Sequence, residues 1–381
     1  DANQKVRVLL AQALFGNPDI LLFDEPTNDL DIKTISWLED FLADFENTVI
    51  VVSHDRHFLD MVCTHICDID YKKINIYTGN YSFWYQASQL ASRQRADKNK
   101  KAEQKKEELL DFIRRFSANA SKSRQATSRK KALEKLNIEE IQPSSRRYPG
   151  LIFNQIREAG NQILEVEKLS SLNEHGTLFS NIEFQVNKGD KIAILSEDSL
   201  AVKYLYEILA GERSQENGEY RWGQTVTVAY IPSVNDKYFT DTLNLVDWLR
   251  QYSEDKDENY IRGFLGKMLF SGDDVFKKSS VLSGGEKVRC MLSRLMLQQG
   301  NVLLLEEPTG HLDLESITAL NESLMDFKGT LLFTSQDHEF TNTIANRIIE
   351  ITPKGIIDKM MTYDEYLADE NVQKMRETMY K

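Results

Sequence analysis

The sequence of 381 residues has few cysteines and no apolar run approaching the roughly 18 residues that a membrane-spanning helix needs. Cys63, Cys67 and Cys290 are too few for a disulfide framework. The four-residue spacing of Cys63 and Cys67 is more typical of a buried helix face than of a zinc site. Acidic residues outnumber basic residues, and the net charge is −12. These deficits exclude a membrane part within this chain and a protein that is basic throughout, and they favour the reducing cytoplasm.

From residue 92 to residue 136 the chain lacks both proline and glycine and is rich in Lys, Glu, Gln, Arg and Ala, which favours helix. Leu109, Phe112, Ile113 and Phe116 recur at helical spacing before polar residues take over. We therefore expect two antiparallel helices with a polar, basic tip. Phe112 and Phe116 fit the seam between these helices better than base stacking.

This segment also concentrates positive charge. Between Arg93 and Lys135 there are 15 Lys or Arg against 6 Asp or Glu. A merely solvated charged face is one explanation, but a basic arm on an acidic body favours a partner rich in phosphate, such as folded RNA. Contacts of this kind position a protein and do not read sequence. The basic residues that crowd the predicted tip are Lys122, Arg124, Arg129, Lys130 and Lys131.

Two stretches of the chain are almost identical: Ile20-Leu-Leu-Phe-Asp-Glu-Pro-Thr-Asn-Asp-Leu-Asp31 and Val302-Leu-Leu-Leu-Glu-Glu-Pro-Thr-Gly-His-Leu-Asp313. Their offset of 282 residues also aligns Ser53 with Ser335 and Tyr81 with Tyr363. A duplication that keeps register over this length indicates two copies of one domain. A strand that ends in paired acids can deliver carboxylates to a nucleotide phosphate and its Mg²⁺. We therefore predict a tandem nucleotide-binding protein with an α/β fold.

The second copy carries further motifs upstream of its acidic strand: Val281-Leu-Ser-Gly-Gly-Glu-Lys-Val-Arg289 and the strand-like Gly189-Asp-Lys-Ile-Ala-Ile-Leu195. The offset carries Ser283 to Asp1, so we expect the first copy to enter the sequence halfway and the chain to be a fragment. Leu-Ser-Gly-Gly-Glu followed by strand-Glu-Pro-Thr-x-x-Leu-Asp resembles the P-loop ATP-binding cassette superfamily. Two such cassettes joined by a basic helical linker resemble the ABC-F family of ribosome-associated ATPases over essentially the whole chain.

The resemblance implies three parts: residues 1–88 as the C-terminal half of a first cassette, residues 89–150 as a basic helical linker, and residues 151–381 as a second cassette. It implies ATP and Mg²⁺ as cofactors, the ribosome and tRNA as partners, and a monomer whose cassettes pair within one chain. In ABC-F proteins the linker reaches toward the tRNA in the ribosomal P site. The five basic tip residues are therefore candidate RNA contacts.

The superfamily binds each ATP between the phosphate loop and acids of one cassette and the Ser-Gly-Gly signature of the other. In the first copy, Asp24 matches the acid that supports Mg²⁺, Glu25 the general base, and His54 the histidine that contacts the γ-phosphate. Asp31 closes the turn that meets the opposite cassette, and Asp313 takes that place in the second copy.

The matching signature lies in the second copy, where the amides and the helix N-terminus would bind the γ-phosphate across the pair. Its residues are Ser283, Gly284, Gly285 and Glu286.

The second copy departs from the family pattern at its own nucleotide positions. A glycine-rich turn ending in Gly-Lys-Ser/Thr should follow Leu195, but the chain reads Ser196-Glu-Asp-Ser-Leu-Ala-Val-Lys203. Glu306 replaces the usual Asp, Gln336 the histidine and Ser233 the γ-phosphate-sensing Gln. The opposing signature, Asp1-Ala-Asn-Gln4, has lost its Ser-Gly-Gly. These losses predict one hydrolytic site and one dead site, in which Glu307 has no water to activate.

The sequence thus favours a cytoplasmic ABC-F ATPase that acts on the ribosome. The full-length protein should hydrolyse ATP, whereas this chain alone should not, and residues 1–88 should expose apolar surface and be poorly soluble. Three alternatives stay open: a non-hydrolysing ATP-gated clamp on RNA or ribosomes, a soluble ATPase subunit of a transporter, and a DNA-repair cassette protein, against which the short linker argues.

Overall fold

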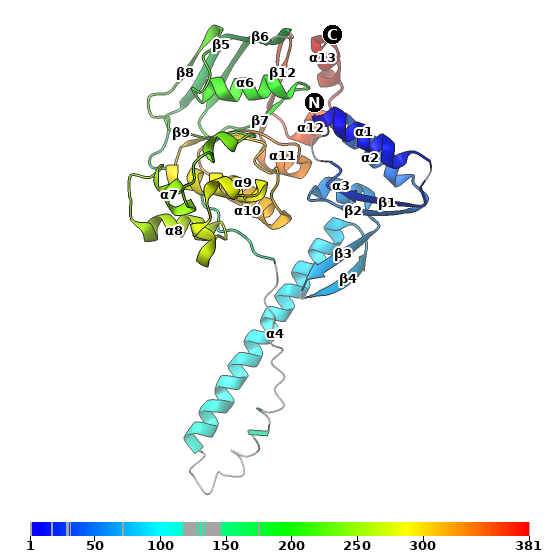
Figure 1. Ribbon diagram of the computed structural model, residues 1–381, viewed down its shortest axis with the longest axis vertical. Coiled ribbons are helices and arrows are strands. Elements are labelled where there is room, and N and C mark those ends of the chain that lie inside the picture. The colour runs from blue at the N-terminus through cyan, green and yellow to red at the C-terminus, as the bar shows by residue number, and fades with distance from the viewer. Residues whose placement is uncertain are drawn as a thin grey trace. The chain divides into compact units, whose positions relative to one another are not determined.

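The computed structural model in Figure 1 describes all residues except 1, 17, 28, 29, 31, 71, 117–127, 129, 132, 134–145, 174, 175 and 381. Its contacts define two compact units. Residues 1–58 and 147–381 make up the first, and residues 59–146 make up the second.

A six-stranded sheet forms the centre of the second half of the chain. Its strands run in the order β13-β12-β7-β11-β10-β9, and neighbours are parallel except for the antiparallel pair β12 and β13. Every residue of β10 and β11 is buried, as expected for apolar strands covered on both faces. The strands are β7 (Lys191–Leu195), β9 (Val228–Ile231), β10 (Val302–Glu306), β11 (Thr330–Thr334), β12 (Arg347–Thr352) and β13 (Gly355–Lys359).

One face of this sheet packs against α6 (Ser199–Leu209) and an antiparallel sheet of β5 (Gln162–Asn173), β6 (Gly176–Asn187) and β8 (Asn217–Trp222). Leu304 and Leu332 point into this core, whereas Leu303 and Leu331 point into the core on the opposite face. The alternation follows from the two-residue period of a strand.

Helices cover the opposite face, and α7 to α11 lie together there (Figure 1). The bounds of these helices are α7 (Leu245–Arg250), α8 (Glu258–Lys267), α9 (Gly284–Gln298), α10 (Leu314–Asp326) and α11 (His338–Ile344). Two more helices, α12 (Tyr363–Ala368) and α13 (Glu370–Tyr380), follow β13 in the chain. Short 3₁₀ turns occupy Asp236–Tyr238, Gly272–Phe276 and Ser279–Val281.

The first 58 residues repeat part of this architecture. Ile20 pairs with Thr48 between β1 and β2, as Val302 pairs with Thr330 between β10 and β11, so both partners shift by the same 282 residues. The duplication is confirmed in the strand register. The elements here are α1 (Ala2–Leu14), β1 (Ile20–Asp24), α2 (Ile32–Ala43), β2 (Thr48–Val52) and α3 (Arg56–Val62), which extends past residue 58.

Apolar side chains are uncovered on the β1–β2 pair. Leu22 is 72% exposed and Ile50 is 56% exposed, whereas their counterparts Leu304 and Leu332 are fully buried. Within the described residues, no counterparts of β7 and β9 flank this pair. The predicted exposure of apolar surface is therefore confirmed for these strands, and the predicted poor solubility stays a prediction.

The second unit contains an antiparallel pair, β3 (His65–Asp70) with β4 (Lys73–Thr78), and the 36-residue helix α4 (Tyr81–Phe116). The helix begins at Tyr81, as α12 begins at the aligned Tyr363, and it runs unbroken past residues 88 and 89 (Figure 1). Cys67 is exposed on β3, so the expected buried helix face for Cys63 and Cys67 is wrong.

Most of the second predicted linker helix falls outside the described residues, as do the side chains of Phe112 and Phe116. Leu109, which shares their helical spacing, is buried on α4. The described helices include none whose length and hydropathy would suit a bilayer span.

Candidate nucleotide site

The paired acids of both copies sit at equivalent strand ends. Asp24 is the last residue of β1 and Glu306 the last residue of β10. The next residues, Glu25 and Glu307, have φ angles of 49° and 47°. A non-glycine residue in this left-handed region is strained and persists only where its surroundings hold it. We infer that both copies retain a backbone built to present this second carboxylate.

The surroundings that hold Glu25 come from the end of β2. Its amide donates to the carbonyl of Val52 at 2.8 Å, and the amide of His54 donates to Oε2 of Glu25 at 3.2 Å. The other oxygen, Oε1, lies 3.4 Å from Nε2 of His54 and has no hydrogen-bond partner among the described residues. Burial raises the pKa of Glu25, and the neighbouring imidazole opposes that rise. An oriented carboxylate with a free acceptor atom suits a base for water.

Asp24 completes the first-copy group, because it is exposed and its charge helps to raise the pKa of Glu25. Carboxylate oxygens are the ligands that Mg²⁺ prefers, so Asp24 fits the acid that would support the metal. The structure thus brings Asp24, Glu25 and His54 together as predicted. Asp31 lies outside the described residues.

In the second copy the general-base position keeps its geometry but loses its histidine. The amide of Glu307 donates to the carbonyl of Thr334 at 2.9 Å, and the amide of Gln336 donates to Oε2 of Glu307 at 3.0 Å. Burial raises the pKa of Glu307 to about 7, and the charges of Glu306 and Asp337 add to the effect. The second copy therefore has the same backbone geometry at this strand end as the first, with Gln336 in place of the histidine.

The metal position of the second copy does not fit a cation. Ser233 Oγ donates to Oε1 of Glu306 at 2.7 Å, while the hydroxyl of Tyr230 and the amide of Ser233 both lie 3.2 Å from Oε2. Glu306 is only 5% exposed. A carboxylate surrounded by protein donors has little capacity left for Mg²⁺. The sequence assigned Ser233 to this site but gave no sign that Tyr230 would join it.

The phosphate-loop position of the second copy is occupied by the chain's own acceptors. Asp198 caps α6 by accepting from the amide of Leu200 at 2.9 Å, and Ser196 Oγ accepts from the amide of Asp198 at 3.2 Å. Val202, which stands where the family pattern has its lysine, is buried. Nζ of Lys203 lies 4.0 Å from Oε1 of Glu207. A helix N-terminus in this place would ordinarily receive phosphate. Here an Asp carboxylate takes that role.

The signature of the second copy is intact as a helix start. Ser283 caps α9, and its amide donates to Oε2 of Glu286 at 2.9 Å in a capping box. A Cβ on Gly285 would lie 2.6 Å from the carbonyl oxygen of His311, and one on Gly284 would lie 3.2 Å from the ring of that residue. Both glycines therefore allow the turn after β10 to approach the start of α9.

The structure describes Asp313 and two of the five candidate RNA contacts. Asp313 caps α10 by accepting from the amide of Ser316 at 2.9 Å, a structural role that sequence reasoning did not assign. Lys130 and Lys131 are helical and exposed. The other three candidate RNA contacts, Lys122, Arg124 and Arg129, lie outside the described residues.

Comparisons with known proteins agree with this geometry. Two family models, both described as ABC transporter, match residues 67–153 and 179–310. The "Uncharacterized ABC transporter ATP-binding protein YkpA" of Bacillus subtilis is 59% identical over 99% of this chain and 70% of that protein. The "Probable ATP-binding protein YbiT" of Escherichia coli is 43% identical over 97% of this chain and 70% of that protein.

The chain therefore belongs to the ATP-binding cassette family of ATPases, and it has their α/β cassette fold. A more distant relative, "ABC transporter F family member 2" of Arabidopsis thaliana, is 32% identical over 97% of this chain and 55% of that protein.

Proposed function

We propose that this chain is part of an ABC-F-type ATPase that binds ribosomes and tRNA in the cytoplasm and hydrolyses ATP at one of two composite sites. The relative described as an F family member supports this assignment, as does the 36-residue helix α4 with its run of exposed lysines. The three-part division at residues 88 and 150 belongs to the same proposal.

The observation that carries the proposal is the difference between the strand ends of the two copies. Glu25 keeps a free acceptor oxygen beside His54, whereas both oxygens of Glu306 already accept from protein donors. A base must have a lone pair available for the proton of the attacking water, and a metal acid must have oxygens available for the cation. These conditions favour hydrolysis at the first copy's acids alone.

In the proposed active site, Asp24 supports the Mg²⁺, Glu25 accepts the proton of water and His54 contacts the γ-phosphate. When bound, Mg²⁺ would neutralise charge on the phosphates. Asp31 and Asp313 belong to the turns that meet the opposite cassette. The signature residues that would complete the site from the second copy are Ser283, Gly284, Gly285 and Glu286.

The proposed partner of the linker is RNA. Lysines along α4, among them Lys100, Lys101 and Lys105, are exposed, as are Lys130 and Lys131. Positive side chains spaced along one long helix suit phosphate contacts along folded RNA. Lys122, Arg124 and Arg129 are assigned to the same surface by their sequence alone.

The test uses a protein of the relatives' length that contains this sequence, with Glu25→Gln and, as the matched control, Glu307→Gln. Removing a general base slows hydrolysis by about 10² to 10⁴ while leaving ATP binding possible. We expect Glu25→Gln to co-sediment with ribosomes in an ATP-dependent manner, and Glu307→Gln to hydrolyse ATP and leave ribosomes as the unsubstituted protein does.

Equal loss of turnover in the two variants would contradict the single hydrolytic site. Retained turnover in Glu25→Gln would remove Glu25 from the base role. If Glu25→Gln binds ATP but stays off ribosomes, the ribosomal assignment fails. The Bacillus relative, named as an ABC transporter ATP-binding protein, then favours a second candidate function, the ATPase subunit of a transporter, to be sought by capture of a membrane partner.

A further inference from the structure

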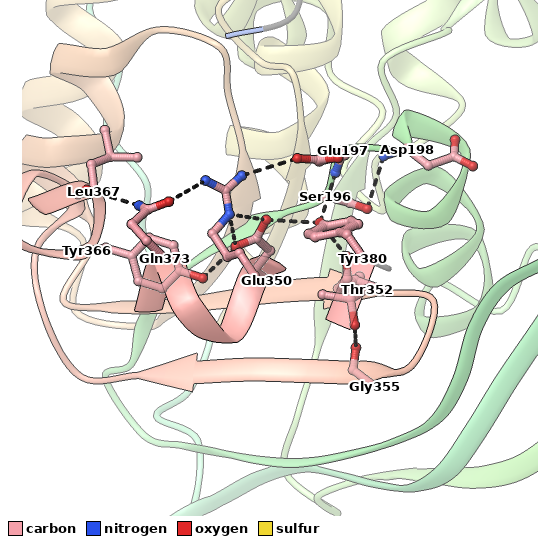
Figure 2. Close-up of polar contacts among 12 residues, drawn as sticks. Ser196, Glu197, Asp198, Glu350, Thr352, Gly355, Tyr366, Leu367, Gln373 and Tyr380 are labelled. Carbon is pink, nitrogen blue, oxygen red and sulfur yellow. Dashed lines mark hydrogen bonds and ion pairs between the residues drawn. The ribbon is translucent and has the colours of Figure 1, made fainter. Parts of the chain in front are cut away.

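A buried acid interrupts the apolar strand β12. Glu350 is 1% exposed, yet it lies between isoleucines that belong to the core. The hydroxyl of Tyr366 donates to Oε2 at 2.6 Å, and Nε of Arg376 lies 3.0 Å from Oε1. Figure 2 shows Glu350 and Tyr366 together in this cluster. A buried carboxylate requires such donors, so this one fixes α12 and α13 against the sheet.

Tyr380, at the end of α13, connects the buried acid to the phosphate-loop position. Its hydroxyl donates to Oε1 of Glu350 at 2.9 Å and accepts from the amide of Glu197 at 3.1 Å (Figure 2). Arg376 adds a weaker contact, with its guanidinium 3.7 Å from Oε1 of Glu197. The last turns of α13 therefore rest on the loop that follows β7.

This contact completes a set of internal acceptors along the loop. The amides of Asp198 and Leu200 already donate to Ser196 Oγ and to the Asp198 carboxylate. With Tyr380, the amide of Glu197 is satisfied as well. In a phosphate-binding loop such amides point at ligand oxygens. Here a side-chain oxygen brought in by the C-terminal helix takes one of those places.

The first copy contains a counterpart of the buried acid and its partners. The offset of 282 aligns Glu350 with Asp68 and Tyr366 with Trp84. Asp68 is buried and accepts from Arg146, whose guanidinium lies 4.7 Å from the centre of the Trp84 ring. Both copies thus hold an arginine on a strand acid beside an aromatic residue. The position aligned with Tyr380 is Lys98, which has no hydroxyl to make such a contact.

We propose that α13 is a resident lid on the phosphate-loop position of the second copy. The Tyr380 hydroxyl occupies the Glu197 amide in place of a ligand oxygen, and Glu350 holds the helix in position through Arg376 and Tyr366. This inference rests on the proposed function, because it explains how a loop that does not receive ATP is kept closed. It also identifies α13 as the element that must move if the loop is to open.

Hydrogen exchange of the full chain tests the lid. Tyr380→Phe removes the hydroxyl and keeps the ring, and the control Glu377→Gln alters an exposed position of the same helix. We expect Tyr380→Phe to speed exchange in peptides covering residues 196–203 by about five-fold, the effect of losing one net hydrogen bond. Residues 330–334 of β11 serve as an internal standard, and the control should match the unsubstituted chain.

Unchanged exchange of the loop in Tyr380→Phe would overturn the lid, and so would equal acceleration in Glu377→Gln. Adding MgATP separates this inference from the proposal on which it rests. If MgATP protects residues 196–203 of the unsubstituted chain, the second copy binds nucleotide and its closed, nucleotide-free loop is wrong. Acceleration by Tyr380→Phe without any effect of MgATP supports both.

Discussion

Glu307 shows, at the scale of one residue, how the second copy differs from the first at the same strand end. Its backbone keeps the strained φ of 47° and its carboxylate keeps an amide donor, but Gln336 stands where the first copy has His54. Burial outweighs the hydrogen bonds from Gln336 and Thr334 that lower the pKa of Glu307, and that pKa rises from 4.5 to about 7. The ionised form of Glu307 is thus a cost to folding at neutral pH.

This cost predicts a pH-dependent effect of Glu307→Gln. An acid whose pKa is raised in the folded state contributes stability that is full below pH 4.5 and is lost as the pH rises through about 7. Glutamine stays neutral at every pH. The free energy of unfolding of the variant should therefore exceed that of the unsubstituted chain by less than about 1 kcal/mol near pH 5 and by about 3 kcal/mol at pH 8.

Urea unfolding of the full chain between pH 5 and pH 8 measures this difference. Exposed Glu322 on α10 provides the control, since its replacement by Gln makes the same chemical change without removing a buried carboxyl. A difference for Glu307→Gln that does not change with pH would show that the Glu307 carboxyl titrates alike in the folded and unfolded states.

Helix α9 shows, at the scale of elements, how one glycine allows two segments to lie close together. Gly285 is in its first turn, and an added Cβ would meet the carbonyl oxygen of His311 at 2.6 Å. Because the obstacle is backbone, Gly285→Ala must shift the turn after β10 or the start of α9. We expect a loss of about 1 to 3 kcal/mol in the free energy of unfolding.

Gly263 on α8 is the matched comparison, because an added Cβ there meets no atom within 4 Å. Gly263→Ala should stabilise the chain by up to about 1 kcal/mol, as alanine favours helix over glycine. Chemical unfolding of both variants decides the matter. Stabilisation by both substitutions would mean that the backbone at His311 does not lie close enough to Gly285 to exclude a side chain.

The elements also show how far the sequence could predict the structure. The offset of 282 located β1, β10 and the paired acids, and the resemblance to the cassette superfamily predicted Glu25 near His54, because strand ends and motifs are local signals. The partners of Asp68 and Glu350 were not predicted, since Arg146 and Arg376 lie 78 and 26 residues away along the chain. A lone acid in an apolar strand signals that a donor is needed but does not say which one.

Over the whole molecule, the parts of the chain differ in net charge and in how much apolar surface they expose. The body is acidic, the segment from Arg93 to Lys135 is basic, and apolar side chains are uncovered on β1 and β2. The basic segment has more charge than its own acids can neutralise. Its binding to RNA should therefore be governed by counterion release, which makes salt the variable that tests it.

The pair Lys130 and Lys131 is suited to this test, because both residues are described, helical and exposed. Replacing both with Gln keeps helix propensity nearly constant and removes two charges. Each lost phosphate contact should reduce the slope of log affinity against log salt by about 0.7 to 0.9. Binding to ribosomes, measured by sedimentation from about 50 to 200 mM salt, should weaken most at the lower concentration.

Lys328 and Lys374 are exposed on the acidic body and give a control with the same change in net charge. Their replacement by Gln should leave the salt slope unchanged, because they lie outside the basic segment. Equal effects of the two pairs would mean that ribosomes respond to total charge, and the proposed RNA contact of the linker would then be wrong. If only the replacement of Lys130 and Lys131 reduces the slope of log affinity against log salt, the phosphate contacts lie on the basic segment.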